Sequence, residues 1–232
     1  MTSGPAFPHR TIRSFVRREG RITEGQQRAL AELLPRYGVP PGDAPIDLTA
    51  LFGRNAPVHV EIGFGNGDAL AAMASAHPHN DYLGIEVHRP GVGALLRQLD
   101  AGSIANVRVI SADAVQVLEQ RIDDDALSAV CLFFPDPWPK KRHHKRRLVQ
   151  PEFLALLRRK LKVGTRLHFA TDWEDYAQHM LKVLSAAEGF ENSAGAGQFA
   201  PSPTTRPPTK FERRGQRLGH GVWDLIFERC SY

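Results

Sequence analysis

The feature that most constrains the fold is a glycine-rich turn between an apolar run and a helical pattern. The run Val58–Ile62 has the composition of a buried strand, and positions 63–68 read GFGNGD where a helix begins. Glycines at alternate positions let the backbone turn tightly and lie against a ligand where a Cβ atom would collide. The turn therefore predicts a strand–loop–helix unit that approaches a ligand closely.

Short apolar patterns typical of strands alternate with helical patterns along the rest of the chain. Strands are predicted at 58–62, 81–87, 107–111, 129–134, 166–170 and 222–227, and helices at 68–76, 91–101, 151–161 and 173–187. This alternation indicates an α/β fold with a mainly parallel sheet and helices on both faces. Such sheets bind ligands beyond the carboxyl ends of their strands, where the strand order reverses.

Residues 1–45 differ from the rest of the chain because they are rich in Arg, Pro and Gly and have no strong apolar period. Pro40, Pro41 and Pro45 then interrupt any regular structure. We expect a basic, mobile extension over residues 1–45, with one helix near Glu24–Tyr37, before a single domain over residues 46–232.

The overall composition is that of an ordinary globular protein, with 42% apolar and 24% charged residues in a chain of 232. Cys131 and Cys230 are too few for a disulfide framework, so we expect a reducing cytoplasm. No apolar run is long enough for a signal peptide or a membrane span. A net charge of +5 is weak evidence for a polyanionic partner.

The glycine loop also carries information about its ligand. The dinucleotide fingerprint is G-x-G-x-x-G with a pyrophosphate at the helix N-terminus, whereas this loop reads G-x-G-x-G and follows Glu61. A carboxylate is unfavourable beside a pyrophosphate, but it suits the ammonium and sulfonium groups of S-adenosylmethionine (SAM). Glu61 could act directly or by fixing the loop. The spacing therefore favours SAM over a nicotinamide dinucleotide.

Two further acids follow the next two predicted strands. Glu86 could accept hydrogen bonds from both ribose hydroxyls, and Asp113 could accept one from the adenine amine. Each acid alone could equally be a solvated loop carboxylate. Three acids after three successive strands, the first beside a triple-glycine loop, favour a SAM site.

A proline-bracketed acid follows the predicted strand 129–134, in the sequence PDPWP at positions 135–139. The prolines on both sides restrict the backbone of Asp136 and stop regular structure. A rigid carboxylate beside Trp138 suits a flipped guanine, because the ring can stack and the acid can accept hydrogen bonds from N1–H and the 2-amino group. The alternative is a stiffened turn in which Asp136 caps a helix.

The next eight residues, Lys140–Arg147, form a basic run in which six are Lys or Arg. Neighbouring like charges repel, so the run is better matched to phosphates than to an ordinary solvated surface. His143 and His144 could be metal ligands, but the flanking cations disfavour this and no Cys or carboxylate nearby completes a set. A nuclear-localisation signal is a further alternative.

Four blocks make the sequence resemble the bacterial tRNA (guanine-N7)-methyltransferase family: Val60–Asp68, Gly84–His88, Pro135–Arg147 and Thr204–Gly215. The Asp-Trp corner with its basic run, combined with the Thr-Lys-Phe-Glu sequence at 209–212, is highly specific. The resemblance extends from Val58 to the C-terminus and does not cover the N-terminal extension.

The resemblance implies a class I methyltransferase (Rossmann-like) fold with a seven-stranded, mostly parallel sheet. It implies transfer of a methyl group from SAM to N7 of the variable-loop guanosine of tRNA, usually numbered 46, which gives 7-methylguanosine and S-adenosylhomocysteine. It further implies a cytoplasmic enzyme whose partner is tRNA, with no metal, no membrane and no obligatory protein partner.

The same resemblance implies roles for individual residues. Asp136 is the expected catalytic residue. The expected cofactor-binding residues are Glu61, Gly63, Gly65, Glu86, Asp113, Ala114 and Asp136. The expected substrate-binding residues are Lys140, Asp172, Thr209, Lys210, Phe211 and Glu212. The expected RNA-contacting residues are Arg142, His143, His144, Lys145, Arg146 and Arg147.

Without the resemblance, Thr209–Glu212 reads as an exposed polar loop, and Asp172 as either a helix N-cap or a site residue. Three rival functions remain at this stage: a SAM-dependent enzyme for a small molecule or protein, a non-enzymatic RNA-binding protein, and a nicotinamide-dependent oxidoreductase. The basic run argues against the first, the intact acids against the second and the glycine spacing against the third.

Overall fold

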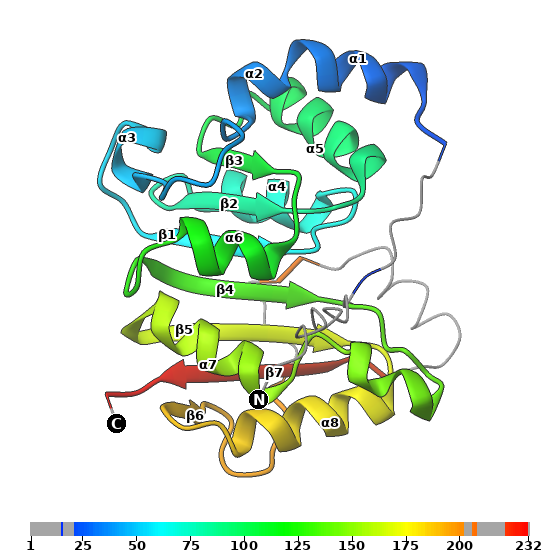
Figure 1. Ribbon diagram of the computed structural model, residues 1–232, viewed down its shortest axis with the longest axis vertical. Helices are drawn as coiled ribbons and strands as arrows, with labels where there is room; N and C mark the ends of the chain where they lie inside the picture. Colours follow the sequence, from blue (N-terminus) through cyan, green and yellow to red (C-terminus); the bar gives the residue numbers. More distant parts are fainter. Residues whose placement is uncertain (1–14, 16–20, 202–205, 208–220, 232) are drawn as a thin grey trace, which may run out of the picture.

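The architecture is a seven-stranded sheet with the strand order β3-β2-β1-β4-β5-β7-β6 (Figure 1). The computed structural model describes residue 15 and residues 21–201, 206–207 and 221–231. Strands β1 to β5 run parallel, and β7 pairs antiparallel with both β5 and β6. The seven-stranded, mostly parallel sheet predicted from the sequence is confirmed.

Most of the strands are short, as their compact apolar runs predict, and β5 is the longest at 11 residues. The strands are β1 (Val58–Ile62), β2 (Asp81–Ile85), β3 (Val107–Ile110), β4 (Leu127–Phe133), β5 (Leu161–Thr171), β6 (Phe190–Asn192) and β7 (Trp223–Arg229). The helices are α1 (Glu24–Glu32), α2 (Leu34–Tyr37), α3 (Leu48–Phe52), α4 (Asp68–Ala76), α5 (Arg89–Ala101), α6 (Ala114–Arg121), α7 (Pro151–Lys160) and α8 (Glu174–Ser185). A 3-10 segment, η1 (Lys141–Arg146), follows β4.

The two faces of the sheet are buried against different helices (Figure 1). The larger core packs α6, α7 and α8 against one face, with Val60, Leu132 and Phe169 among its buried strand residues. On the second face, α4 and α5 pack over the β1–β3 side of the sheet. Alternate side chains along each strand enter opposite cores, as the two-residue period of a strand requires.

The N-terminal helices are part of this second core. Ala29 of α1 and Tyr37 of α2 are buried with Leu96 of α5. Gly38, which follows α2, forms an isolated parallel bridge to Val109 of β3. A Cβ atom at Gly93 of α5 would lie 2.8 Å from the carbonyl oxygen of Gln26, so α1 and α5 approach with their backbones nearly in contact.

The expectation of a mobile extension therefore differs from the structure over residues 24–38. The expected single helix is two helices, because Pro35 lacks an N–H group and can occupy only the first turn of a new helix. For residues 1–14 and 16–20 the expectation falls outside the described residues, and the domain boundary at residue 45 stays a prediction.

Four elements were not predicted from the sequence: α3, α6, η1 and β6. Helix α6 is the most relevant to function, because Asp113 is its N-cap and the Asp113 side chain accepts a hydrogen bond from the Val115 N–H at 2.9 Å. Strand β5 also begins earlier than expected, directly after α7, and its first residue, Leu161, is buried. Among the described helices, none is long and apolar enough to cross a membrane.

Candidate functional site

A cavity of about 450 Å³ lies beyond the carboxyl ends of β1, β2, β3 and β4. This is the position at which the strand order reverses between β1 and β4, where open α/β sheets bind their ligands. Five predicted site residues line the cavity: Gly63, Glu86, Asp113, Ala114 and Asp136. The apolar part of the wall comes from Ile62, Ile85, Leu132, Phe133, Phe134 and Leu148.

The glycine loop adopts the backbone conformation that only glycine tolerates easily. Gly63, Gly65 and Gly67 have φ angles of 70°, 58° and 82°. A Cβ atom on Gly91 of α5 would lie 2.1 Å from the carbonyl oxygen of Gly65, so α5 packs directly on the loop. Gly65 itself does not line the cavity, and its part is to hold the shape of the loop.

Glu86 is buried at the end of β2 and fixes the backbone around it. Its Oε2 accepts a hydrogen bond from the Gly65 N–H at 2.8 Å, and its Oε1 accepts from the N–H groups of Val87 and His88 at 2.7 and 2.9 Å. Oε1 thus uses both of its lone pairs, whereas Oε2 keeps one for a further donor. Glu86 therefore joins the glycine loop to the second wall of the cavity and keeps acceptor capacity for a ligand.

Glu61 does not line the cavity. The side chain is 3% exposed, and its Oε2 has no hydrogen-bond partner among the described residues. Burial, followed by the nearby charge of Glu86, raises the pKa of Glu61 from 4.5 to about 8. A buried acceptor of this kind, beside the glycine loop, would gain most from a nearby cation.

Asp136 is exposed at the mouth of the cavity, in a turn with a strained backbone. Phe134 and Trp138 both have positive φ angles, 52° and 48°, which bulky residues rarely adopt. The Phe134 N–H donates to the carbonyl oxygen of Ala170 at 2.8 Å. The helix-capping alternative for Asp136 is wrong, because η1 starts after Lys140 and has no side-chain cap.

Two arginines of the basic run contact this turn and stabilise it. The Arg146 guanidinium lies 4.8 Å from the centre of the Trp138 ring. Arg147 is 3% exposed, donates from Nε to the Pro137 carbonyl oxygen at 2.9 Å and forms an ion pair with Asp175. The structure thus places Arg147 inside the protein, where it holds the turn, and not on the surface where an RNA contact was expected.

Most of the rest of the basic run faces outward, whereas Nε2 of His144 is buried 3.7 Å from Oδ2 of Asp175. Lys140, Arg142 and Lys145 are exposed, and His143 and His144 are partly exposed. Desolvation and the neighbouring cations, Arg142 first among them, lower the pKa of His143. A phosphate placed here would relieve this mutual repulsion. Among the described residues, no cluster of His, Cys, Asp or Glu is arranged to hold a metal ion.

The remaining predicted residues lie at the same end of the sheet or outside the described residues. Asp172 is partly exposed after β5, and the N-cap reading for it is wrong because Trp173 occupies that position without a side-chain hydrogen bond. Trp173 is 39% exposed, unusually high for a large apolar side chain. Thr209, Lys210, Phe211 and Glu212 fall outside the described residues.

Sequence reasoning missed several cavity residues, including Phe15, His88, Phe134 and Leu148. Phe134 was the last residue of a predicted strand and His88 belonged to the Gly84–His88 block, but neither was assigned to the site. Phe15 and Leu148 reach the cavity from distant parts of the chain, which no local pattern reveals.

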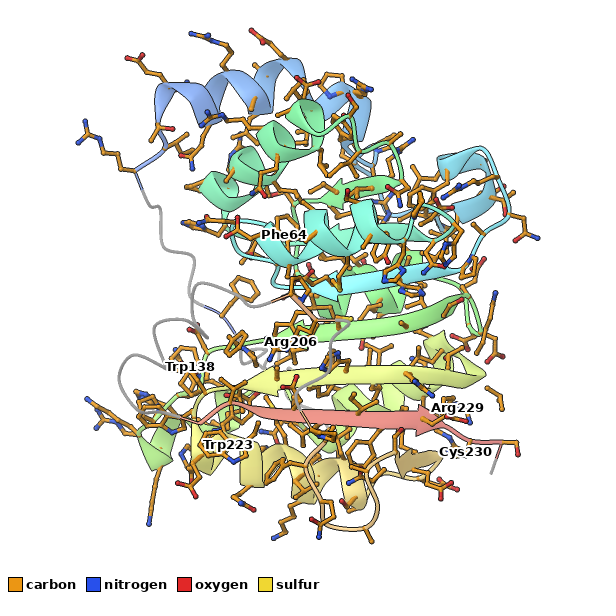
Figure 2. The ribbon with its side chains drawn as sticks, turned by 180° about the vertical axis from the view of Figure 1, so that it is seen from behind. Phe64, Trp138, Arg206, Trp223, Arg229 and Cys230 are labelled. Atoms are coloured by element: carbon orange, nitrogen blue, oxygen red, sulfur yellow. The ribbon has the colours of Figure 1, made fainter. Side chains whose placement is uncertain are left out.

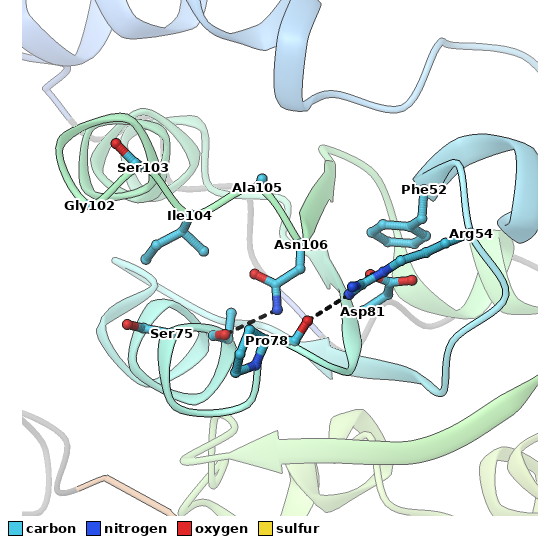
Figure 3. A pocket seen from close by; sticks show the side chains of 11 residues that line it. Phe52, Arg54, Ser75, Pro78, Asp81, Gly102, Ser103, Ile104, Ala105 and Asn106 are labelled. Atoms are coloured by element: carbon cyan, nitrogen blue, oxygen red, sulfur yellow. Dashed lines mark hydrogen bonds and ion pairs between the residues drawn. The ribbon is translucent and has the colours of Figure 1, made fainter.

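A second cleft, of about 440 Å³, lies at the opposite, amino end of the strands (Figure 3). Its charged pair is Arg54 with the buried Asp81, joined from Nη2 to Oδ1 at 2.6 Å. Asn106 donates to backbone carbonyl oxygens of Ala74 and Asn80 at 3.0 and 2.9 Å. These hydrogen bonds hold the loops at the amino ends of the strands in place. No predicted site residue lines this second cleft.

The strand order and the cavity beyond the strand ends are those of the class I SAM-dependent methyltransferase fold. The structure is similar to the 16S rRNA (adenine(1408)-N(1))-methyltransferase from Catenulisporales acidiphilia, with a TM-score of 0.53 and 18% identity over 82% of this chain and 97% of that one. A structure of a variant of that enzyme with its cosubstrate SAM also has a TM-score of 0.53, at 17% identity over 79% of this chain and 90% of that one. At these identities the likeness shows the fold alone.

The sequence comparisons then fix the family. The methyltransferase family model Methyltransf_4 matches residues 55–225. The tRNA (guanine-N(7)-)-methyltransferase of Pseudomonas aeruginosa strain PAO1 is 59% identical over 97% of this chain and 93% of that protein. The protein of the same name from Klebsiella pneumoniae subsp. pneumoniae is 58% identical over 97% and 94%. The chain belongs to the tRNA (guanine-N(7)-)-methyltransferase family.

The raised pKa of Glu61 generates a prediction about stability and pH. The folded protein holds a proton on Glu61 more tightly than the unfolded chain, so wild-type stability falls as pH rises from 4.5 to about 8. Glu61→Gln cannot ionise, so its free energy of unfolding should rise relative to wild type across this interval. Urea unfolding at several pH values measures the difference, with the exposed Glu119→Gln as control. Parallel curves for Glu61→Gln and wild type would contradict the burial argument.

Proposed function

We propose that this protein transfers a methyl group from SAM to N7 of a guanosine in tRNA, at position 46 of the variable loop. The observation that carries the proposal is the placement of Asp136 between the cavity and the exposed basic run that follows it. Family membership supports the reaction, and the arrangement supports a target base presented next to a phosphate-binding surface. We further propose that the protein works in the cytoplasm without a metal or an obligatory protein partner.

The residues around the cavity fit SAM in three respects. Glu86 and Asp113 place acceptors at the ends of adjacent strands, where ribose hydroxyls and the adenine amine can donate. Gly63 exposes its backbone to the cavity because it has no side chain, and the small side chain of Ala114 takes up little of the cavity. Glu61, behind the glycine loop, has an unpartnered buried oxygen that favours positive charge nearby. SAM, when bound, supplies an electrophilic methyl group on a sulfonium.

The reaction needs no general base. N7 of guanine has an in-plane lone pair and carries no proton, so the residues have only to bind and align the base. Alignment of two bound reactants can contribute up to about 7–11 kcal/mol to the barrier reduction. In this proposal Asp136 accepts hydrogen bonds from the Watson–Crick edge of guanine and stabilises the positive charge that develops on the ring.

The tRNA surface of the proposal extends on both sides of Asp136. Lys140, Arg142, His143 and Lys145 face outward and are positioned for phosphates, and Arg146 can combine an RNA contact with its support of Trp138. For His144, whose Nε2 is buried near Asp175, an RNA contact is proposed from the family pattern alone. Asp172, beside the exposed Trp173, lies at the carboxyl end of the neighbouring strand β5. For Thr209, Lys210, Phe211 and Glu212, substrate binding is proposed from the family pattern alone.

The direct test is incubation with methyl-labelled SAM and an unmodified tRNA transcript, followed by digestion and nucleoside analysis. We expect the label in 7-methylguanosine, and loss of that label when position 46 of the transcript is changed from guanosine. Label in another nucleoside would overturn the base assignment. Labelling of a protein or small molecule that survives ribonuclease treatment would favour the rival class of methyltransferase.

Asp136→Ala and the isosteric Asp136→Asn test the catalytic assignment. Both should reduce the single-turnover rate by about 10²-fold or more, because the base loses its aligning acceptor and the charge that stabilises the methylated ring. The dissociation constant for tRNA should change little, since Asp136 is one contact in a large surface. An unchanged single-turnover rate in Asp136→Asn would remove Asp136 from catalysis.

The salt dependence of tRNA affinity tests the basic surface. Each phosphate contact contributes roughly 0.7–0.9 to the slope of log affinity against log salt concentration. Arg142→Ala and Lys145→Ala should each weaken tRNA binding and reduce this slope. Lys162→Ala, which removes an exposed charge from the opposite end of the sheet, is the matched control. If both variants keep the wild-type slope, these side chains do not contact phosphate.

A further inference from the structure

A buried charge network occupies the part of the second face that α4 and α5 leave uncovered. Arg206 is 4% exposed and donates from Nε and Nη2 to the two carboxylate oxygens of Asp224, at 2.9 and 3.0 Å. The ring of His168 lies within hydrogen-bond distance of Asp224 as well, at 2.7 Å. The network thereby links β5 and β7 to the chain that precedes β7. Figure 2 shows Arg206 in front of the sheet, on the side of Trp138.

The same guanidinium covers two rings of the cofactor cavity. The Arg206 carbon Cζ lies 5.9 Å from the centre of the Phe133 ring and 5.5 Å from that of Phe134. Phe133 also meets the edge of His168, with ring centres 5.0 Å apart. Phe133 and Phe134 both line the cavity, and both contact Arg206 of the charge network. The two rings therefore connect the cavity wall to the network.

The Asp224 carboxylate is held in its charged form. Burial alone would raise the pKa of Asp224, but hydrogen bonds from His168 and Arg206 outweigh burial and lower it. Asp224 can therefore fix the plane of the Arg206 guanidinium through two parallel hydrogen bonds, and a planar guanidinium held in this way can stack on aromatic rings. A lysine could keep the charge at this position but neither the fork nor the stacking plane.

Phe134 is the residue whose position matters most for the reaction. It has a φ angle of 52°, and Asp136 follows it by two residues in the turn. A bulky residue holds such a backbone only when its surroundings define its position tightly. On one side the Ala170 carbonyl oxygen binds its N–H, and on the other Arg206 covers its ring.

We propose that Arg206, fixed by Asp224 and His168, is a positioning residue for methyl transfer: it holds Phe134, and through it the turn that carries Asp136, in register with the cofactor cavity. Arg206 does not touch the reacting atoms. It acts by keeping the wall of the cavity and the aligning carboxylate in one rigid unit. The inference rests on the proposed methyltransferase function.

Arg206→Lys tests the proposal because it keeps the positive charge and removes the planar fork. The single-turnover rate at saturating SAM and tRNA should fall by about 10–10²-fold, the effect expected of a displacement of about 1 Å at a reacting centre. The tRNA dissociation constant should stay within about threefold of wild type, since the basic surface is unchanged. Asp224→Asn should also lower the single-turnover rate, but less strongly than Arg206→Lys. If Arg206→Lys fails to fold, Asp224→Asn takes its place in the comparison of rate with tRNA affinity.

A purely structural role for the network is tested by Asp81→Asn. Asp81 is as deeply buried as Asp224, at 1% exposure, and is also paired with an arginine, but it lies at the amino end of the strands (Figure 3). Rates are compared well below each unfolding midpoint and per mole of folded protein. We expect Asp81→Asn to lower the midpoint and leave the rate unchanged. An equal loss of rate in Asp81→Asn and Arg206→Lys would overturn the positioning role.

A double-mutant cycle with Phe134→Leu tests the route from Arg206 to the turn. If Arg206 acts through the Phe134 ring, the two substitutions should be non-additive, and Arg206→Lys should cost much less rate in the Phe134→Leu background. Additive losses, or an Arg206→Lys rate within about twofold of wild type, would refute the proposal. Wild-type enzyme is the reference throughout, so absence of its activity on tRNA would count against the proposed function instead.

Discussion

The turn from Phe133 to Trp138 places bulky side chains where the backbone resists them. A non-glycine residue in the left-handed region costs about 1–3 kcal/mol, and this turn contains two, Phe134 and Trp138. The surrounding protein holds the conformation through the Ala170 carbonyl, the buried Arg147 on Pro137, and guanidinium groups over both strained aromatic rings. Much of the chain beyond β4 therefore contributes to the geometry of one exposed carboxylate.

Three acidic side chains of the site differ in their exposure to solvent. Glu61 is sealed behind the glycine loop, Glu86 is buried but bonded to backbone N–H groups, and Asp136 stands at the surface beside the cationic segment. In the proposed function, Glu61 and Glu86 lie on the side of the methyl donor, and the basic run lies on the side of the polyanionic acceptor.

Single residues show which parts of the fold and of the site could be predicted from the sequence. The strands β1 and β3 were readable because each apolar run is short and bounded, and the glycine loop because its spacing is unusual. Helix α6 was not predicted, although Asp113, its N-cap, directly precedes an apolar helical period. The burial of Arg147 was beyond local reasoning, because Asp175 and Tyr176, its partners, are brought to it by tertiary folding. The same holds for Arg206 and Asp224.

Helix α5 touches its two neighbours through glycines two positions apart, Gly91 on the carbonyl of Gly65 and Gly93 on the carbonyl of Gln26. Both contacts are made by main-chain atoms, so they depend on spacing and hardly on which side chains the neighbours carry. The exposed faces of the N-terminal helices can thus vary in composition while the helices keep their spacing from the glycine loop, whereas buried residues such as Ala29 and Tyr37 are held by the core. If the proposed function holds, that outer surface can change, for example to suit another tRNA body, while the geometry of the glycine loop underneath is kept.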